Sequence, residues 1–346
     1  MLRELDHFAD ETGTRRLASV FFGGGTPSLM DPATVAALLD AAADRWDLPA
    51  DAEITLEANP GTVDAGRFAD FRAAGVNRLS LGVQSLREDG LRFLDRIHDL
   101  AAARAAIEAA ARRFDRFSFD LIYARPGQDA AAWRAELADG LALAGDHLSL
   151  YQLTVEPGTP FAAAVARGDW TPPGEEDAAA LYELTQAATA AAGLPAYEIS
   201  NHAAPGGESR HNLIYWRGGD YIGVGPGAHG RLTRNGRRTT LRQARTPEAW
   251  LAEVEARGHA TREVAPLSRD EWIDELLMMG LRLAAGIGRD RFRAAAGAEI
   301  EAVLAAGRLA ALGDAGLIAL DADGLRATAA GRLRLDAVLA YLRGAG

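Results

Sequence analysis

Several short apolar runs of this chain end in polar or glycine-rich segments, and these segments hold the best candidates for binding or catalytic residues. Glu57, Gln84, Arg96 and Asp120 lie at or just beyond the ends of three such runs. Arginine binds carboxylates through two parallel hydrogen bonds, whereas aspartate, glutamate and glutamine suit ammonium and hydroxyl groups. Each residue alone is more typical of a capped turn or a surface ion pair. Together they form a set suited to an amino-acid head group and a ribose.

A glycine run precedes these residues and offers a place for backbone to approach a ligand. It reads Gly23-Gly24-Gly25-Thr26, directly after the apolar run 19–22. Glycine permits close backbone approach, although a tight turn between strand and helix explains the same pattern. A second run, Gly225-Pro226-Gly227-Ala228-His229-Gly230, formally matches G-x-G-x-x-G. A dinucleotide site requires a helix after this motif, and an arginine-rich hairpin is expected there instead.

Histidines and arginines gather between residues 202 and 245. His202, His211 and His229 show no paired spacing of the H-E-x-x-H kind, so the sequence supports no mononuclear metal site. Six arginines follow without an acid among them: Arg231, Arg234, Arg237, Arg238, Arg242 and Arg245. A solvated hairpin face explains them, and a patch for anionic groups such as tetrapyrrole propionates is the functional alternative.

The elements that must position these residues alternate between strand and helix. Strands are expected at 19–22, 54–58, 78–83, 118–122 and 147–153, and helices at 33–45, 64–74, 99–113 and 129–143. This alternation indicates βαβ units and a parallel sheet, whose ligand sites lie at the carboxyl ends of the strands. We expect a β-rich segment over 194–265, with a type I′ hairpin at Asn235-Gly236. Helices around a short β pair predict a small winged-helix-like domain over 266–346.

Composition excludes several kinds of site. The 346 residues carry a net charge of −11, which argues against a dedicated nucleic-acid binder. Every basic residue is arginine, so no lysine is present for a P-loop or a Schiff base. Cysteine is also absent, which leaves no thiolate for a disulfide, zinc or an iron–sulfur cluster. No secretory signal or membrane-spanning run is evident, so we expect a cytoplasmic protein.

Ordered motifs from about residue 20 to 230 resemble one family. They are FFGGGTPS, LEANPGT, RLSLGVQS, DLIYARPGQ, HLSLYQLTVEPGTPF, YEISN and HNLIYW…YIGVGPGAHG. The chain resembles the radical-SAM family of oxygen-independent coproporphyrinogen III oxidase-like proteins, and within it the heme chaperone branch. The resemblance implies a partial (β/α)₆ barrel over residues 1–193 that lacks its first strand and binds S-adenosylmethionine and a [4Fe-4S] cluster.

Carried onto this chain, the resemblance assigns roles to individual residues. Gly24, Gly25 and Thr26 would hold the methionine part of S-adenosylmethionine. Glu57, Gln84, Arg96 and Asp120 would complete the polar cradle, with Arg96 facing the ligand carboxylate. His211 and His229 are the candidate heme-binding residues.

The chain departs from the family at the cluster. Family members carry three cysteines spaced C-x₃-C-x₂-C after their first strand, and no residue here replaces them. Removing the first strand would also leave the apolar run 19–22 as a bare edge, which favours aggregation, so we expect about 50 upstream residues and an internal Met1. The rival hypothesis is a shortened paralogue that binds heme or cofactor without catalysis.

The resemblance favours a heme-binding chaperone that transfers heme to acceptor proteins, which can include membrane-associated ones. The alternative is an oxygen-independent coproporphyrinogen III oxidase of porphyrin biosynthesis. A nucleotide-binding module built on the glycines of 225–230 is a third hypothesis.

Overall fold

A computed structural model of the chain describes residues 1–62 and 65–344, and these form two compact units. The first, here the sheet unit, comprises Val20–Val35 and Glu53–Ser209. The second unit comprises Met1–Ser19, Ala36–Ala52 and Arg210–Gly346.

The sheet unit is built on six strands in the order β1-β2-β3-β4-β5-β6. Strands β2 to β5 are parallel neighbours, as the alternation of strands and helices predicts. Strand β6 pairs antiparallel with β5, which the sequence did not indicate. Among the described strands the order has two ends, so the sheet is open rather than a closed barrel. The strands are β1 (Ser19–Phe22), β2 (Glu53–Ala58), β3 (Arg78–Gln84), β4 (Arg116–Tyr123), β5 (His147–Gln152) and β6 (Asn201–Ala203).

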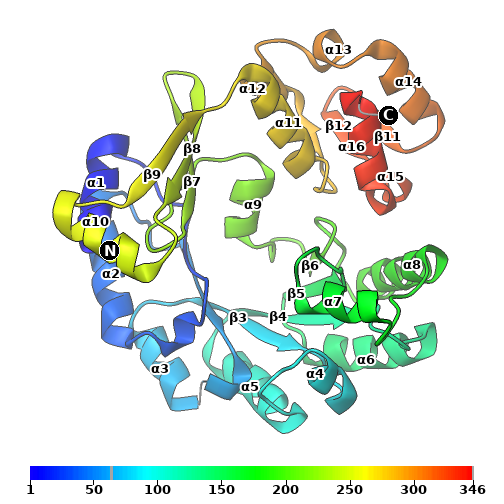
Figure 1. The fold of residues 1–346 in the computed structure, drawn as a ribbon, viewed down its shortest axis with the longest axis horizontal. Helices are drawn as coiled ribbons and strands as arrows, with labels where there is room; N and C mark the ends of the chain where they lie inside the picture. Colours follow the sequence, from blue (N-terminus) through cyan, green and yellow to red (C-terminus); the bar gives the residue numbers. More distant parts are fainter. Residues whose placement is uncertain (63–64, 345–346) are drawn as a thin grey trace. The chain divides into compact units, whose positions relative to one another are not determined.

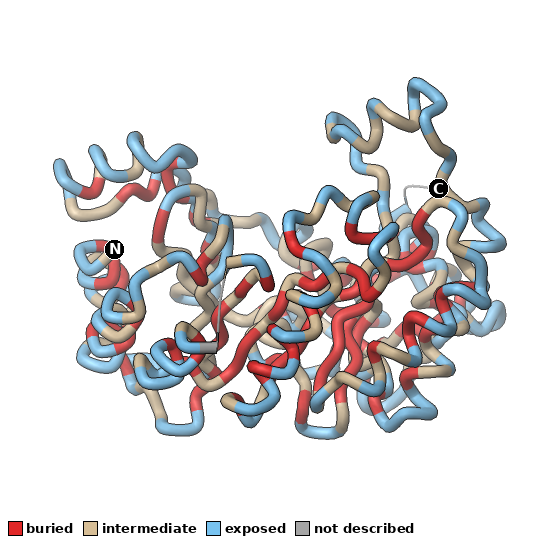
Figure 2. Tube along the Cα trace, turned by 90° about the horizontal axis from the view of Figure 1, so that it is seen from below, coloured by how far each residue is buried: buried red, intermediate tan, exposed pale blue. Residues whose placement is uncertain are grey.

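Helices cover one face of this sheet (Figure 1). Leu79, Leu81 and Val83 alternate along β3 and are fully buried, and α5 lies against both β3 and β4. Figure 2 shows buried positions concentrated along the strands of this unit, with exposed positions on the helices. The helices are η1 (Pro27–Leu29), η2 (Pro60–Thr62), α3 (Ala65–Ala73), α4 (Glu88–Phe93), α5 (Leu100–Arg113), α6 (Ala130–Leu143), α7 (Pro160–Arg167) and α8 (Glu175–Ala191).

The second unit begins with a helix, α1 (Leu2–Thr12), that packs in one apolar cluster with the last turns of α2 (Pro32–Arg45). Phe8 and Trp46 are buried in this cluster together with Leu232 and Leu241. These two leucines come from β7 (His229–Arg234) and β8 (Arg237–Gln243), which form a three-stranded sheet with β9 (Thr261–Pro266).

Two local predictions within the second unit have different outcomes. Asn235 and Gly236 have φ of 50° and 72°, which confirms the type I′ hairpin between β7 and β8. The expectation of β structure around His211 is wrong, because residues 210–216 form α9 (Arg210–Trp216).

The C-terminal part of the second unit combines short helices with a three-stranded antiparallel sheet in the order β10-β12-β11. The capping box at Ser268 and Glu271 fixes the first turn of its first helix. Its elements, with the preceding α10 (Pro247–Arg257), are α11 (Arg269–Gly280), β10 (Ile287–Gly288), α12 (Arg289–Ala296), α13 (Ile300–Val303), α14 (Ala306–Asp314), β11 (Ile318–Leu320), β12 (Gly324–Ala327), α15 (Ala329–Leu333) and α16 (Leu335–Arg343).

Candidate functional site

A polar cavity of ≈ 170 Å³ lies within the sheet unit. Its floor comes from alternate residues of β3, since Ser80, Gly82 and Gln84 share the face opposite the buried leucines. The lining residues are Gly25, Pro27, Glu57, Ala58, Asn59, Ser80, Gly82, Gln84 and Asp120. Strand residues alternate between an apolar face covered by helices and a polar face that is free to bind a ligand.

Strand register places these side chains near one another, because Ser80 pairs with Ser118, two residues before Asp120. Glu57 is the partner of Ser80 in the β2–β3 pair, and Asp120 is the partner of Ser149 in the β4–β5 pair. The β3–β4 register shifts between Leu81 and Gln84, and Gln84 has φ of 72°. Such irregularities re-aim a side chain at the end of a strand, and here they coincide with a residue that lines the cavity.

Gly82 creates room for a polar cluster at the cavity wall. Arg96 Nη2 donates to Asn59 Oδ1 at 3.0 Å and to the Gly82 carbonyl oxygen at 3.5 Å. A Cβ at position 82 would lie 2.9 Å from Asn59 Oδ1 and 3.2 Å from Gln84 Nε2. Any side chain there would therefore displace the amides of Asn59 or Gln84.

The glycine run holds a carboxylate at the cavity. The Gly24 N–H donates to Glu57 Oε2 at 3.2 Å. Gly24 and Gly25 have φ of 84° and 63°, a conformation that strongly favours glycine. Thr26 ends this turn, where its carbonyl oxygen accepts from the Leu29 N–H at 3.0 Å.

Two carboxyl groups of the cavity hold protons more tightly than usual. Burial raises the pKa of Asp120 to about 7, and the Glu57 carboxylate adds to this effect while Ser149, Arg78 and Arg96 oppose it. Burial also raises the pKa of Glu57, and the hydrogen bond from the Gly24 N–H lowers it by a smaller amount. A cation or a hydroxyl donor in the cavity would stabilise the ionised forms.

The structure brings together most of the residues that the sequence singled out here. Gly25, Glu57, Gln84 and Asp120 line the cavity. Gly24 and Arg96 contact lining residues, and Thr26 is absent from the lining. Sequence reasoning did not select Asn59, Ser80 or Gly82. The alternation Ser80-x-Gly82-x-Gln84 within an apolar strand was the signal for two of them.

The two candidate heme histidines lie on different elements of the second unit. On α9, His211 Nδ1 lies 3.0 Å from Ser19 Oγ, and its Nε2 lies 2.7 Å from the Tyr215 hydroxyl. His229 is exposed at the start of β7, where it is the register partner of Arg242. Heme ligation by His211 would require one of its two hydrogen bonds to break.

The arginines of the β7–β8 hairpin are largely neutralised by acids from other segments. Glu275 pairs with Arg231 at 2.8 Å and with Arg238 at 3.0 Å. Arg234 pairs with Glu11, and Arg242 pairs with Glu263. The hypothesis of a free anion-binding patch is therefore wrong for these four arginines. The acids that neutralise them are distant in sequence, which is why counting charges within the hairpin misled.

Neither metal ligands nor membrane-spanning helices are found in the described part of the chain. Residues 1–62 and 65–344 contain no group of three or more histidine, cysteine or acidic residues arranged to hold a metal ion. With no cysteine in the sequence, the residues present do not fit an iron–sulfur cluster. No described helix is long and apolar enough to cross a membrane.

The glycine-rich run at 225–230 is built differently from a dinucleotide site. It leads into β7 rather than into a helix, as expected. The Gly225 N–H donates to Glu4 Oε2 at 3.0 Å, and Glu4 is fully buried. This run therefore anchors α1, and its first N–H is already engaged.

Comparison with known proteins identifies the family. The radical SAM superfamily matches residues 2–138, and the HemN C-terminal domain matches residues 267–334. Radical S-adenosyl methionine domain-containing protein 1, mitochondrial, from Bos taurus is 43% identical over 96% of this chain and 76% of its own length. The heme chaperone HemW of Mycobacterium tuberculosis H37Rv is 40% identical over 99% of this chain and 84% of its own length.

A solved structure supports the fold independently. The coproporphyrinogen III oxidase HemN of Escherichia coli, a radical SAM enzyme, superposes with a TM-score of 0.80 over 100% of this chain and 82% of its own. At 22% identity this similarity concerns the fold alone. The sequence identities, sustained over almost the whole chain, establish that it belongs to the radical SAM superfamily, in the family that contains the heme chaperone HemW and its mitochondrial relatives.

Proposed function

We propose that this chain is a heme chaperone, which binds heme and transfers it to acceptor proteins. The observation that carries the proposal is 40% identity to a heme chaperone over 99% of the chain. The alternative, a coproporphyrinogen III oxidase, has weaker support, because the solved oxidase is only 22% identical over the same length.

We propose further that the polar cavity holds part of S-adenosylmethionine. Its volume of ≈ 170 Å³ is below the roughly 300–1,000 Å³ of sites that enclose a whole small ligand, so a part of the molecule would enter it. Glu57 and Asp120 complement the ammonium, sulfonium and hydroxyl groups of this ligand, and Gly25 permits close backbone approach. Gln84 and Arg96 would orient it through their amide and guanidinium groups.

S-adenosylmethionine supplies, when bound, a cationic adenosine ligand with a carboxylate and a ribose. The chain's own residues bind and orient these groups, and the raised pKa of Asp120 lets that carboxyl donate or accept a proton near neutral pH. The residues of this chain do not fit an iron–sulfur cluster.

The heme ligand is assigned to His211 or His229. His229 is exposed at the start of β7, so its ring can reach an iron without any movement of α9. His211 contacts Tyr215 on α9 with ring centroids 4.7 Å apart, and aromatic side chains offer faces for a porphyrin. In this proposal Tyr215 releases His211 Nε2 when heme binds.

Heme titration of the full chain tests the proposal. The unaltered chain should shift the Soret band at stoichiometric heme, and His211→Ala or His229→Ala should abolish the shift. His7→Ala is the matched control, since its ring belongs to α1 and it is not a candidate ligand. A chain that causes no Soret shift, or that decarboxylates coproporphyrinogen III, would refute the chaperone assignment. An unchanged shift in the double histidine variant would refute the ligand assignment alone.

The acceptors and the compartment are also part of the proposal. We propose cytoplasmic heme-accepting proteins as partners, by analogy with bacterial relatives named heme chaperones. The relatives from cattle and zebrafish are named mitochondrial. Transfer of heme from the loaded chain to cytosolic apoproteins, followed by difference spectra, tests the acceptor class.

A further inference from the structure

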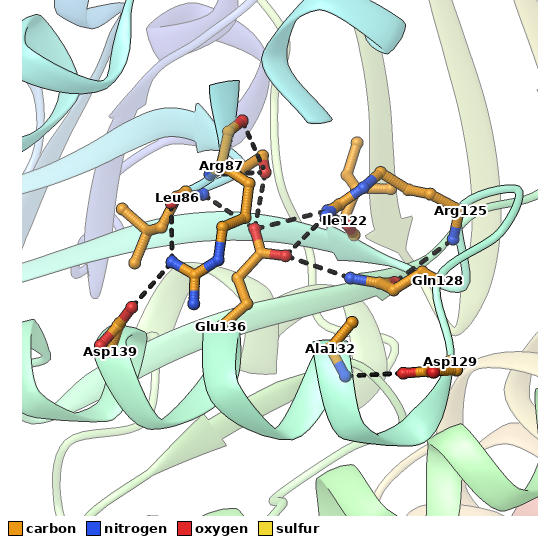
Figure 3. Close-up of polar contacts among 10 residues, drawn as sticks. Leu86, Arg87, Ile122, Arg125, Gln128, Asp129, Ala132, Glu136 and Asp139 are labelled. Carbon is orange, nitrogen blue, oxygen red and sulfur yellow. Dashed lines mark hydrogen bonds and ion pairs between the residues drawn. The ribbon is translucent and has the colours of Figure 1, made fainter. Parts of the chain in front are cut away.

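One buried carboxylate lies outside the cavity and contacts the segments that follow β3 and β4, two strands that line the cavity (Figure 3). Glu136 belongs to α6, and its side chain is 1% exposed. Its Oε1 accepts from Ser85 Oγ at 2.6 Å and from the Leu86 N–H at 2.8 Å. Its Oε2 accepts from Arg125 Nη2 at 2.6 Å and from Gln128 Nε2 at 3.1 Å.

Both contacted segments begin with a residue in a costly conformation. Gln84, directly before Ser85, has φ of 72°, and Ala124, directly before Arg125, has φ of 59°. Outside glycine this left-handed region costs about 1–2 kcal/mol per residue, so it persists only where surrounding contacts hold it. The hydrogen bonds of Glu136 start at the next residue in each case.

The space around this carboxylate is tightly filled by its hydrogen-bond partners. A Cβ on Gly90 would lie 2.3 Å from Ser85 Oγ and 3.0 Å from the Arg125 guanidinium carbon. Arg125 Nη1 also donates to the Ile122 carbonyl oxygen at 2.6 Å, at the end of β4. The segments after β3 and β4 are thereby locked to α6 at one point.

From these contacts we infer that Glu136 is a positioning residue of the cavity. By holding Ser85 and Leu86, it fixes the left-handed backbone of Gln84 and thus the direction of the Gln84 carboxamide, which lines the cavity. The inference rests on the proposed function only in one respect, which is that the ligand contacted by Gln84 is S-adenosylmethionine. It predicts that Glu136, which is not a lining residue, controls ligand affinity through Gln84.

A carboxylate is required at this position because every partner is a donor. Ser85 and Leu86 donate to one oxygen, and Arg125 and Gln128 donate to the other. In Glu136→Gln, the new NH₂ group would face either the donors of Ser85 and Leu86 or those of Arg125 and Gln128. The variant keeps the shape of the side chain and breaks the hydrogen bonds to the segment after β3 or to the segment after β4.

Hydrogen exchange of the full chain gives a readout that needs no ligand. In Glu136→Gln, the amides of residues 84–88 should exchange about tenfold faster, the effect of about 1.4 kcal/mol from a lost hydrogen bond. Ser85→Ala removes only the hydroxyl contact and should show a smaller change of the same kind. The matched control is Asp139→Asn, which changes another residue of α6 and breaks its partly buried pair with Arg87, 2.7 Å long. It should leave exchange at residues 84–86 unchanged.

A double-mutant cycle then separates positioning from general destabilisation. With S-adenosylhomocysteine as the probe, Glu136→Gln should weaken binding about tenfold in the unaltered chain and cause no further loss in a Gln84→Ala background. Equal losses in both backgrounds would show a merely structural role and overturn the inference. Unchanged exchange at residues 84–88 in both Glu136→Gln and Ser85→Ala would also overturn it. If the unaltered chain binds no S-adenosylhomocysteine, the cofactor assignment fails, and the exchange data alone decide whether Glu136 holds Gln84.

Discussion

At the scale of single residues, the cavity depends on the absence of side-chain atoms as much as on their presence. Gly82 leaves space for the amides of Asn59 and Gln84, while Arg96 spans the carbonyl of Gly82 and the Asn59 side chain. A glycine in mid-strand weakens the strand, so its position here is explained by what packs over it.

Gly82→Ala should therefore impair the cavity more than it impairs the fold. The added methyl would lie 2.9 Å from Asn59 Oδ1, and the displaced amides should weaken S-adenosylhomocysteine binding about tenfold by calorimetry. Gly61→Ala is the matched control, because its nearest neighbours would be 3.5 Å away and its φ is not left-handed. Equal affinities for both variants would contradict the steric argument.

Asp120 should impose a distinct pH dependence on stability. Its pKa is about 7 in the folded chain and 3.8 for an aspartate fully exposed to water, so between these values the folded state holds a proton that the unfolded state releases. The contribution of this group to the free energy of unfolding thus falls as pH rises from about 4 to about 7.

Asp120→Asn removes that contribution and isolates it from other titrations. The stability of the variant relative to the unaltered chain should rise by about 1–2 kcal/mol between pH 5 and pH 8, as measured by urea unfolding. The comparison is needed because burial lowers the pKa of His202 to about 4 and that of His147 well below 6.5. These histidines act in the opposite direction and destabilise the fold as pH falls below 6.5. A difference that is constant with pH would contradict the assignment.

At the scale of elements, α7 depends on few contacts. None of its residues is buried, and it follows the polar segment after β5. Phe161 stacks on Phe93 of α4 with centroids 5.3 Å apart, and Trp170 meets both rings edge-on. This aromatic triplet joins α7 to α4.

Trp170→Ala should release α7 locally. Aromatic pairs contribute about 0.5–1.5 kcal/mol each beyond burial, so amides of residues 161–167 should exchange roughly tenfold faster. Amides of α5 in the same variant serve as the internal control, since no ring of the triplet belongs to that helix. Unchanged exchange in α7 would show that other contacts hold it.

The elements also show how far the sequence predicts the fold. The alternation over residues 19–153 predicted five strands and four helices close to their observed bounds, because apolar periodicity is a local signal. The helix α9 was missed, since Ile214, Tyr215 and Trp216 are typical of strands and tertiary contacts overrode that tendency. The buried Arg78 could not be foreseen, because its partner Ser118 lies on another strand, 2.9 Å from Nη2.

The same reasoning applies to the candidate site. Glu57, Gln84 and Asp120 could be selected because polar residues at strand ends contrast with their apolar neighbours. Glu136 could not, since it occupies an ordinary helical position and acquires its role only through the segments that meet there.

At the scale of the whole molecule, the chain passes back and forth between its two compact units. The second unit draws on residues 1–19, 36–52 and 210–346, so it is not a continuous piece of sequence. Within that unit, Glu275 of α11, in the region matched by the HemN C-terminal domain, neutralises two arginines of the β7–β8 hairpin. One of them, Arg238, has only 2% of its side chain exposed.

Glu275→Ala should therefore destabilise the second unit strongly. Removing one partner of a buried pair typically costs about 3–5 kcal/mol, and Asp220, which lies 3.4 Å from Arg238, should limit the loss to about 2–3 kcal/mol. Glu263→Ala breaks the pair with Arg242, in which both side chains are more than half exposed, and should cost less than about 1 kcal/mol. Urea unfolding of the two variants makes the comparison. Equal losses would contradict the argument that the burial of Arg238 makes its pair with Glu275 costly to break.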